Sequence, residues 1–236
     1  MLEPTFHSGL DMGGAHLRRA VPGSNGAQTL PDLLLIERAR AGDEQAIEAL
    51  IHRYSARLFR VAHSVLLDPQ RAEAVVLEAL FAAFGDLSRY EPTGKFAAWL
   101  TRLAYQQARA QRPASRLMPP AGSTGEQPAP QGAVREQQEL EQAIAALPEV
   151  FRTVYVLRMV EGISGIDTAA CLGLHETTVR TRLYRAHRRL PPDTTQRLRG
   201  AVGLLERSPE RAERIASHAL AQLAHGSMLT ISASPP

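Results

Sequence analysis

The 236-residue sequence has one cysteine, one lysine, few aromatic residues and no long apolar run. Because Cys171 is the only cysteine, no intrachain disulfide can form, which is typical of a protein in a reducing compartment. No apolar stretch reaches the ~18 residues of a membrane span, and the N-terminus lacks the apolar segment of a secretion signal. We therefore expect a cytoplasmic protein with no membrane insertion.

Patterns for β-strands and for enzymatic chemistry are also absent. No run rich in Val, Ile and Thr alternates with polar residues, and with aromatic residues at 5% the core has to be built from Leu, Ala and Val. The histidines lack metal-ligand spacing, and there is no glycine-rich phosphate loop. We expect an all-α protein that is not an enzyme and has no cofactor or metal, with Cys171 buried and inert.

Periodicity, proline and glycine divide the chain into five segments. Residues 1–30 are predicted to be a disordered leader, and residues 113–134 a flexible Pro/Gly-rich linker. Residues 31–112 hold four amphipathic helices, which can close one core. Residues 135–192 form a second helical domain, and residues 193–236 a helical extension and tail. The sequence therefore predicts two helical domains joined by a flexible linker.

Helix boundaries in the first domain carry clear signals. Gly42 suits the position after a helix, and Asp43 can cap the helix that follows. That helix is expected to end near Leu67. Asp68 then caps the next helix, whose first position is occupied by Pro69, a residue that needs no N–H there.

The second domain contains the sequence form of a helix-turn-helix. Ser164 and Asp167 have the spacing of a capping box, the short helix that they begin ends before Gly173, and a longer helix follows. On this longer helix one stripe is apolar and predicted to face inward. Its members are Val179, Leu183, Ala186 and Leu190.

The outward side of the longer helix is basic. Residues 175–190 contain five arginines and one acid, a net charge of +4, whereas the whole chain has a net charge of only +3. A solvated charged face is the simple interpretation of such a helix. The preceding short helix and glycine turn favour a recognition helix in a DNA major groove, where arginine reads guanine and later arginines meet phosphates.

Two stretches resemble a known family. "ALPEVFRTVYVLRMVEGISGIDTAACLGLHETTVRTRLYRAHRRL", residues 146–190, resembles without a gap the minus-thirty-five-binding domain of the extracytoplasmic-function (ECF) sigma factors of the sigma-70 family. The stretch "RARAGDEQAIEALIHRYSARLFRVAHSVLLDPQRAEAVVLEALFAAF", followed by "RYEPTGKFAAWLTRLA", is similar to their polymerase-core-binding and promoter-melting domain. The resemblance implies that the protein binds RNA polymerase core, recognises promoter DNA and initiates transcription of a specific regulon.

The resemblance also implies three sets of binding residues. The minus-thirty-five set is His175, Glu176, Thr177, Thr178, Arg180, Thr181, Tyr184, Arg185 and Arg188. The minus-ten and melting set is Arg89, Tyr90, Lys95, Arg102, Gln106 and Arg109, of which the first three are candidates to hold a flipped base. The polymerase-core set is Glu73, Leu77 and Glu78. For Tyr90, packing in the core is an equally good interpretation.

Several positions depart from the family pattern. Ala74 and Leu77 replace the usual Asp and Gln, Gln106 stands where Asn is usual, and Gly165 replaces a bulky residue. Ala74 and Leu77 favour an alternative, in which the chain is a helix-turn-helix regulator whose N-terminal domain is a protein-interaction module and not part of a sigma subunit. An anti-sigma factor as a further partner is compatible with the first hypothesis.

The extension contains two apolar stripes, each too short to form a core alone. We expect them to dock on the same chain, with a regulatory partner as the main competing hypothesis. The stripes are Leu198, Val202 and Leu205, then Ile215, Ala219 and Leu223.

Overall fold

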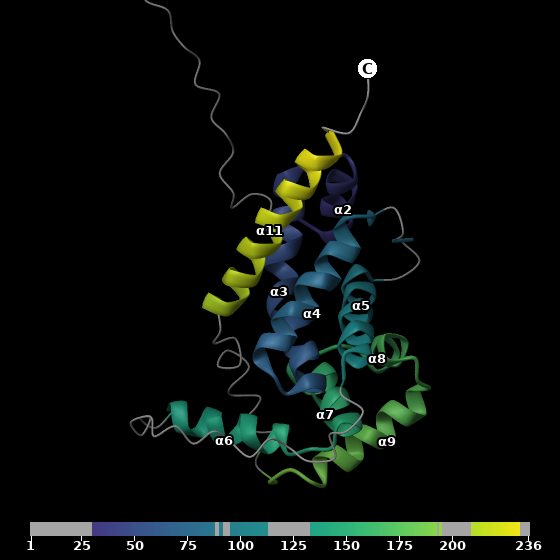
Figure 1. Cartoon of the computed structure of the whole chain (residues 1–236). Coiled ribbons are helices and arrows are strands. Elements are labelled where there is room, and N and C mark those ends of the chain that lie inside the picture. Colours follow the sequence, from purple (N-terminus) through teal and green to yellow (C-terminus); the bar gives the residue numbers. More distant parts are fainter. Residues whose placement is uncertain are drawn as a thin grey trace, which may run out of the picture.

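The structure is a computed structural model that contains only helices in its described part. It describes residues 30–87, 90–91, 95–112, 133–192, 194 and 209–231, without the side chains of residues 133–137, 209 and 225–231. Every regular element in these ranges is helical, which confirms the predicted all-α class (Figure 1). None of the described helices combines the length and the hydrophobicity that a membrane-spanning segment needs. Almost all of the predicted leader and of the predicted linker lies outside the described residues.

The N-terminal domain is a bundle of four helices. They are α2 (Asp32–Arg40), α3 (Glu44–Leu66), α4 (Pro69–Phe84) and α5 (Phe96–Ala110). The long helix α3 packs against each of the other three, and α4 also packs against α5. Their apolar faces close a single core, in which Leu50, Leu58 and Leu80 are fully buried.

The predicted caps fix the ends of these helices. The carboxylate of Asp43 accepts hydrogen bonds from the backbone N–H groups of Gln45 and Ala46, at 3.0 and 3.2 Å. Asp68 does the same at the start of α4, where Pro69 is the first helical residue. Caps of this kind satisfy backbone donors that have no partner within the helix, so both predictions are confirmed.

The C-terminal domain contains the predicted helix-turn-helix. Its elements are α6 (Ala133–Ala145), α7 (Glu149–Tyr155), the π-helical turn η2 (Val156–Val160), α8 (Gly165–Leu172) and α9 (Glu176–His187). The Ser164 hydroxyl accepts the Asp167 N–H at 3.0 Å, and Gly173, with φ +64°, ends α8. Because α6 begins at Ala133, the linker prediction, which ran to residue 134, is two residues too long. The π-helical turn was not predicted.

The extension returns to the N-terminal domain. Helix α11 (Pro209–Ile231) lies along α3 and α4 (Figure 1). Ile215 and Ala219 are buried in the core of the four-helix bundle, and Leu223 is partly buried against it. The prediction that this stripe docks on the same chain is confirmed. The first stripe, within residues 195–208, lies outside the described part of the chain.

The two domains pack together, which corrects the picture of independent domains joined by a flexible linker. Helix α8 lies against α5, and α7 lies against α3 (Figure 1). Val61 of α3 is completely buried in an apolar cluster that otherwise consists mainly of residues from the C-terminal domain, among them Val154, Leu157 and Leu172. The apolar stripe of α3 therefore serves two cores, one in its own domain and one shared between the domains.

Candidate DNA and polymerase interfaces

Helix α9 presents the predicted face to solvent. Of the inward stripe, Val179, Ala186 and Leu190 are buried and Leu183 is partly buried. The outward residues are all exposed: Thr177, Arg180, Thr181, Tyr184, Arg185 and Arg188. The predicted orientation of the helix is confirmed, and its outward arginines are accessible to a polyanion.

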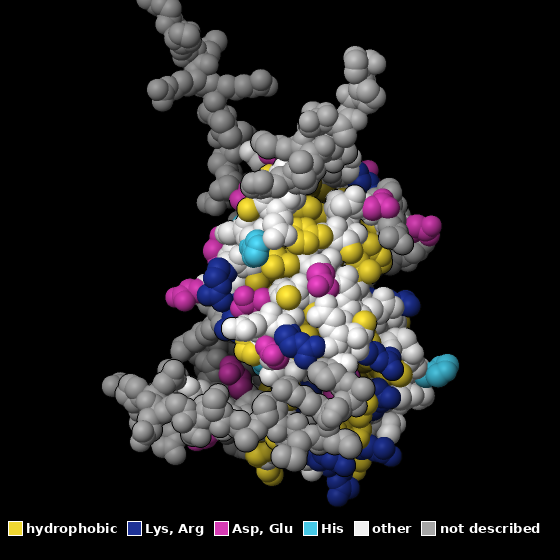
Figure 2. Space-filling model, in the orientation of Figure 1, with side chains coloured by type: hydrophobic (Ala, Val, Ile, Leu, Met, Phe, Trp, Pro, Cys, Tyr) yellow, Lys and Arg dark blue, Asp and Glu magenta, His cyan; other side chains and the backbone are white. Residues whose placement is uncertain are grey.

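The outward face of α9 is ordered by a few contacts within the helix. The Thr181 hydroxyl donates to the carbonyl of Thr177 at 2.9 Å, and the Arg188 guanidinium lies 6.0 Å from the centroid of the Tyr184 ring. Lys and Arg side chains gather at the end of the molecule where α9 lies (Figure 2). An open hollow of about 440 Å³ runs beside this face, between α9 and Phe151 of α7.

The N-terminal end of α9 is open as well. His175 and Glu176 are exposed, and Thr178 is half-buried. Gly165 at the start of α8 lies beneath Glu176, and a Cβ atom at position 165 would come within 3.0 Å of the Glu176 carboxylate. The glycine leaves room for this conformation of Glu176, which a bulky residue would displace.

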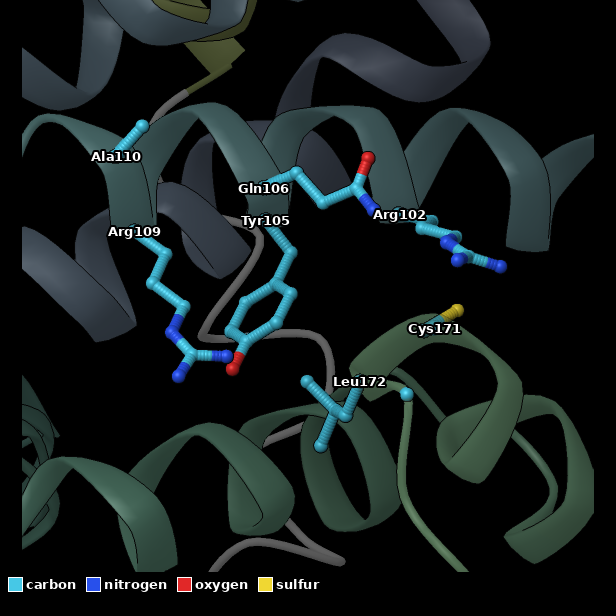
Figure 3. A pocket seen from close by; sticks show the side chains of 8 residues that line it. Arg102, Tyr105, Gln106, Arg109, Ala110, Cys171 and Leu172 are labelled. Carbon is cyan, nitrogen blue, oxygen red and sulfur yellow. The ribbon is translucent and has the colours of Figure 1, made fainter.

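The predicted minus-ten residues on α5 share one face, and that face points toward α8. Arg102, Gln106 and Arg109 are exposed and line a cavity of about 550 Å³ (Figure 3). The other wall of this cavity is formed by Cys171, Leu172 and Gly173 of the helix-turn-helix. The two candidate DNA-binding regions are therefore in contact with each other, and α8 partly covers the surface of α5.

The start of α5 is tied to the other domain through Lys95. Its ammonium group lies 2.8 Å from the carboxylate of Asp167 in α8. The hydrogen bond from Lys95, followed by that from the Ser164 hydroxyl, lowers the pKa of Asp167 below its ordinary value. In this conformation the Lys95 charge is paired across the domain boundary.

Tyr90 lies in the core of the N-terminal domain. The residue is 5% exposed, and its ring packs edge-on against Phe96 and tilted against Trp99, with both centroid distances 5.2 Å. Burial raises the pKa of its hydroxyl. The core-packing interpretation therefore holds here, and the prediction that Tyr90 offers its ring to a flipped base is not supported by this conformation. Arg89 lies outside the described residues.

The three predicted polymerase contacts on α4 lie in different surroundings. Glu73 is approached by two arginines of α11, Arg211 and Arg214. Leu77, one turn further along α4, packs partly buried against the domain core. Glu78 is exposed and accepts a hydrogen bond from the Gln111 amide at the end of α5, at 2.7 Å. Of these three, Glu73 is the one that the extension covers.

Sequence reasoning missed the polar contacts that hold the domains together. The Glu161 carboxylate, whose side chain is 3% exposed, is ion-paired with Arg57, at 3.1 Å, and with Arg60 of α3. Buried Arg152 of α7 donates to the carbonyl of Ser64 at 2.5 Å. Burial lowers the pKa of Arg152 to about 10. These partners are about 90 to 100 residues apart in the chain, and no local pattern links them.

Cys171 lies in the same interface. It is 2% exposed, and its thiol lies 3.3 Å from the carbonyl oxygen of Ala98 in α5. Burial, followed by the nearby charge of Asp167, raises the pKa of the thiol to about 11, so the unreactive protonated form dominates at neutral pH. The prediction that Cys171 is buried is confirmed. Among the described residues, no cluster of three His, Cys, Asp or Glu side chains is suited to hold a metal ion.

A helix-turn-helix whose last helix exposes a basic face, joined to a helical bundle with a second arginine-bearing face, is typical of two-domain DNA-binding proteins. Comparisons with known proteins specify the family. Residues 50–112 match the family model for sigma-70 region 2, and residues 137–190 match that for sigma-70 region 4. The chain belongs to the sigma-70 family of RNA polymerase sigma factors and to its ECF branch.

Individual relatives support this assignment over most of their length. The chain is 30% identical to the RNA polymerase sigma-H factor of Pseudomonas aeruginosa, over 66% of this chain and 89% of that protein. It is 29% identical to the ECF sigma-E factor of Escherichia coli, over 68% and 92%. Among solved structures it is similar to CnrH in complex with the cytosolic domain of CnrY, with 27% identity, a TM-score of 0.51, and 67% and 93% coverage.

Proposed function

We propose that this sigma factor directs RNA polymerase core to its promoters through three surfaces. Helix α9 reads the minus-thirty-five element, the face of α5 that carries Arg102, Gln106 and Arg109 engages the minus-ten region, and α4 contacts the polymerase. The observation that carries this proposal is the exposed face of α9, which combines hydroxyl groups and arginines and has the apolar stripe on its other side.

The chemistry of α9 suits a major groove. Arginine can donate two hydrogen bonds to O6 and N7 of guanine, and threonine can contact bases or phosphates. Thr177, Arg180 and Thr181 lie in the N-terminal half of the helix, which reaches the base edges when a recognition helix docks. Arg185 and Arg188 follow one and two turns later, where a docked helix meets the DNA backbone.

Use of both promoter elements requires the domains to separate. The two elements are centred roughly 25 base pairs apart, or ~85 Å at about 3.4 Å per base pair. In the structure, α5 and α8 are in direct contact, and Cys171 lies against Ala98. Promoter binding therefore involves an open conformation, in which the Glu161 ion pairs and the Lys95–Asp167 pair are broken. The conformation in the structure is the closed one.

Substitution of single arginines in α9 tests the recognition surface. We expect Arg180→Ala to weaken promoter binding by the holoenzyme by ~1–3 kcal/mol if this residue reads a base, and to relax the sequence preference at one position of the minus-thirty-five element. An arginine that contacts only phosphate lowers the affinity for all sequences alike and reduces the salt dependence. Measurements on promoters with single base changes separate these two effects.

Arg182 provides a matched control on the same helix. It is two residues from Arg180, so it points to a different side of α9, and it is half-buried beside α7. Arg182→Ala removes the same charge and is expected to have the smaller effect on sequence preference. If Arg180→Ala and Arg185→Ala both leave promoter affinity and sequence preference unchanged in a folded protein, α9 is not the recognition helix.

The polymerase part of the proposal needs an assay of its own. Purified core enzyme with the full chain should give run-off transcripts from a genomic promoter library, whereas core enzyme alone should not. A regulator that does not act as a sigma subunit would bind DNA without supporting such transcripts.

A further inference from the structure

Helix α11 covers the part of the N-terminal domain that carries a candidate polymerase contact. The Glu73 carboxylate of α4 lies 3.0 Å from Nε of Arg211 and 3.2 Å from Nη2 of Arg214. Arg211 also lies over the ring of Phe59 in α3, with Cζ 4.8 Å from the ring centroid. A single arginine therefore bridges α11 to both helices of the face that it covers.

The rest of the contact is a narrow apolar seam. Ile215, Ala216 and Ala219 are at most 2% exposed, and Leu220 and Leu223 pack partly buried beside them. At the edge of the seam, Glu213 of α11 lies 3.2 Å from the imidazole of His52 in α3. The two small alanines allow α11 to approach the surface closely, so this is a fitted site for one helix.

Most of the polar contacts of α11 are weak, so another molecule that binds the α3–α4 face can replace them. The Arg214 and Glu213 side chains are 62% and 64% exposed, and ion pairs this open to solvent contribute little. The Arg211–Glu73 pair is better shielded, with side chains 31% and 27% exposed, and is the main polar contact of α11. The apolar seam involves only three side chains that are at most 2% exposed. A helix in a protein owes most of its stability to the packing of its apolar face, so α11 is held by this short seam. A partner that binds the α3–α4 face more tightly can therefore displace α11.

We propose that α11 is a built-in competitor of the RNA polymerase core, which occupies in cis the α3–α4 face that presents Glu73 to the polymerase. This inference rests on the proposed function in taking Glu73 as a polymerase contact. Only chains with α11 displaced are competent to bind, so the apparent affinity for core enzyme is reduced by the competent fraction. The extension thereby sets the fraction of the sigma factor that can bind RNA polymerase core.

Hydrogen exchange on the full-length chain tests the displacement directly. In the free protein, amides of residues 210–224 should be protected; in the complex with core enzyme they should exchange at least tenfold faster. Amides of α3 should stay protected in both states, because the bundle remains folded. If α11 keeps its protection in the complex, α11 and the polymerase bind at the same time and the inference is wrong.

Point variants of the full chain test the affinity. Ala216→Glu with Ala219→Glu places two carboxylates in the apolar seam and should strengthen core binding at least tenfold. The control, Ser217→Glu with Ala224→Glu, adds the same charge on the exposed side of α11 and should leave core binding unchanged. Retained amide protection in α3, α4 and α5 verifies that the bundle of the variant is folded.

The outcomes separate this inference from the proposed function. Equal affinities of wild type, variant and control for core enzyme overturn the competitor role and leave the sigma-factor proposal standing. A failure of all three proteins to bind core enzyme overturns the proposed polymerase contact, and the inference falls with it. Tighter binding by the seam variant alone, together with deprotection of α11 in the complex, supports both.

Discussion

The Glu161 ion pairs are among the contacts of the closed conformation, and their loss should raise the population of the open one. Glu161 lies at the end of the η2 turn, and its side chain is 3% exposed, whereas those of Arg57 and Arg60 are 28% and 25% exposed. Removal of one partner from a fully buried ion pair destabilises a protein by ~3–5 kcal/mol, because the other charge is left without compensation. Here the two guanidinium groups can recover some hydration, so we expect the smaller value of ~2 kcal/mol for Glu161→Gln.

This free energy acts on the equilibrium between closed and open domains. In the open conformation Glu161 and both arginines are hydrated, so the substitution destabilises mainly the closed state. At about 1.4 kcal/mol per factor of ten, a change of ~2 kcal/mol raises the open population roughly 30-fold. Glutamine keeps the size of the side chain, which limits the effect to the loss of charge.

Cys171 reports the open population without any added label site. It is the only cysteine, it is buried against α5 in the closed state, and its thiol has a raised pKa there. Alkylation with iodoacetamide should therefore proceed through the open conformation, and its rate should rise about 30-fold in Glu161→Gln. The control Glu44→Gln removes an exposed carboxylate at the start of α3 and should react at the wild-type rate.

Local unfolding of α8 could also expose Cys171, so amide exchange in α8 and α9 has to be measured in parallel. Unchanged exchange within these helices with faster alkylation identifies domain opening. An alkylation rate in Glu161→Gln equal to that of the wild type would refute the role of the Glu161 ion pairs in stabilising the closed arrangement.

Two further predictions concern stability. Burial, and then the charges of Arg211 and Arg152, lower the pKa of His63, so the folded protein favours the neutral ring. The free energy of unfolding should therefore not depend on His63 above the unfolded pKa of ~6.5 and should fall as the pH drops below it. In denaturant titrations, His63→Gln should reduce this dependence on pH. Gly173 ends α8 at φ +64°, so Gly173→Ala should destabilise the protein by ~1–2 kcal/mol and Gly173→Asn by less. Equal melting temperatures of both variants and the wild type in thermal unfolding would contradict this reasoning.

Local features of the sequence predicted the helix ends and the direction of α9. The Asp43 and Asp68 caps act within three residues of themselves, so their chemistry is complete in a short stretch of sequence. The inward stripe of α9 follows from helical periodicity alone, and Val179 and Ala186 are buried as expected. These features do not depend on how the domains are arranged.

The closed arrangement could not be predicted, because its contacts join residues that are far apart in the chain. Glu161 belongs to a stretch that resembles the sigma-factor pattern, but nothing local indicates that Arg57 and Arg60 are its partners. The burial of Tyr90 could not be predicted either, because it depends on where Phe96 and Trp99 lie after the loop. Periodicity shows which face of a helix is apolar, but not which element of the fold will cover that face.

The N-terminal domain is covered by the C-terminal domain on one side and by α11 on another, and the two interfaces differ in chemistry. This difference suggests that the release of the C-terminal domain and the release of α11 are controlled separately. Between the domains, a buried arginine, a buried carboxylate and the shared Val61 cluster form the contact, so opening breaks ion pairs and hydrogen bonds of charged groups. Under α11, the contact consists of a short apolar seam, largely exposed ion pairs and one partly shielded pair, Arg211–Glu73. The α5–α8 interface should accordingly respond to the loss of a single charge such as Glu161, whereas α11 should respond to changes in the apolar seam. If Glu161→Gln also releases α11, as seen by exchange of its amides, the two interfaces are coupled through α3, which belongs to both of them.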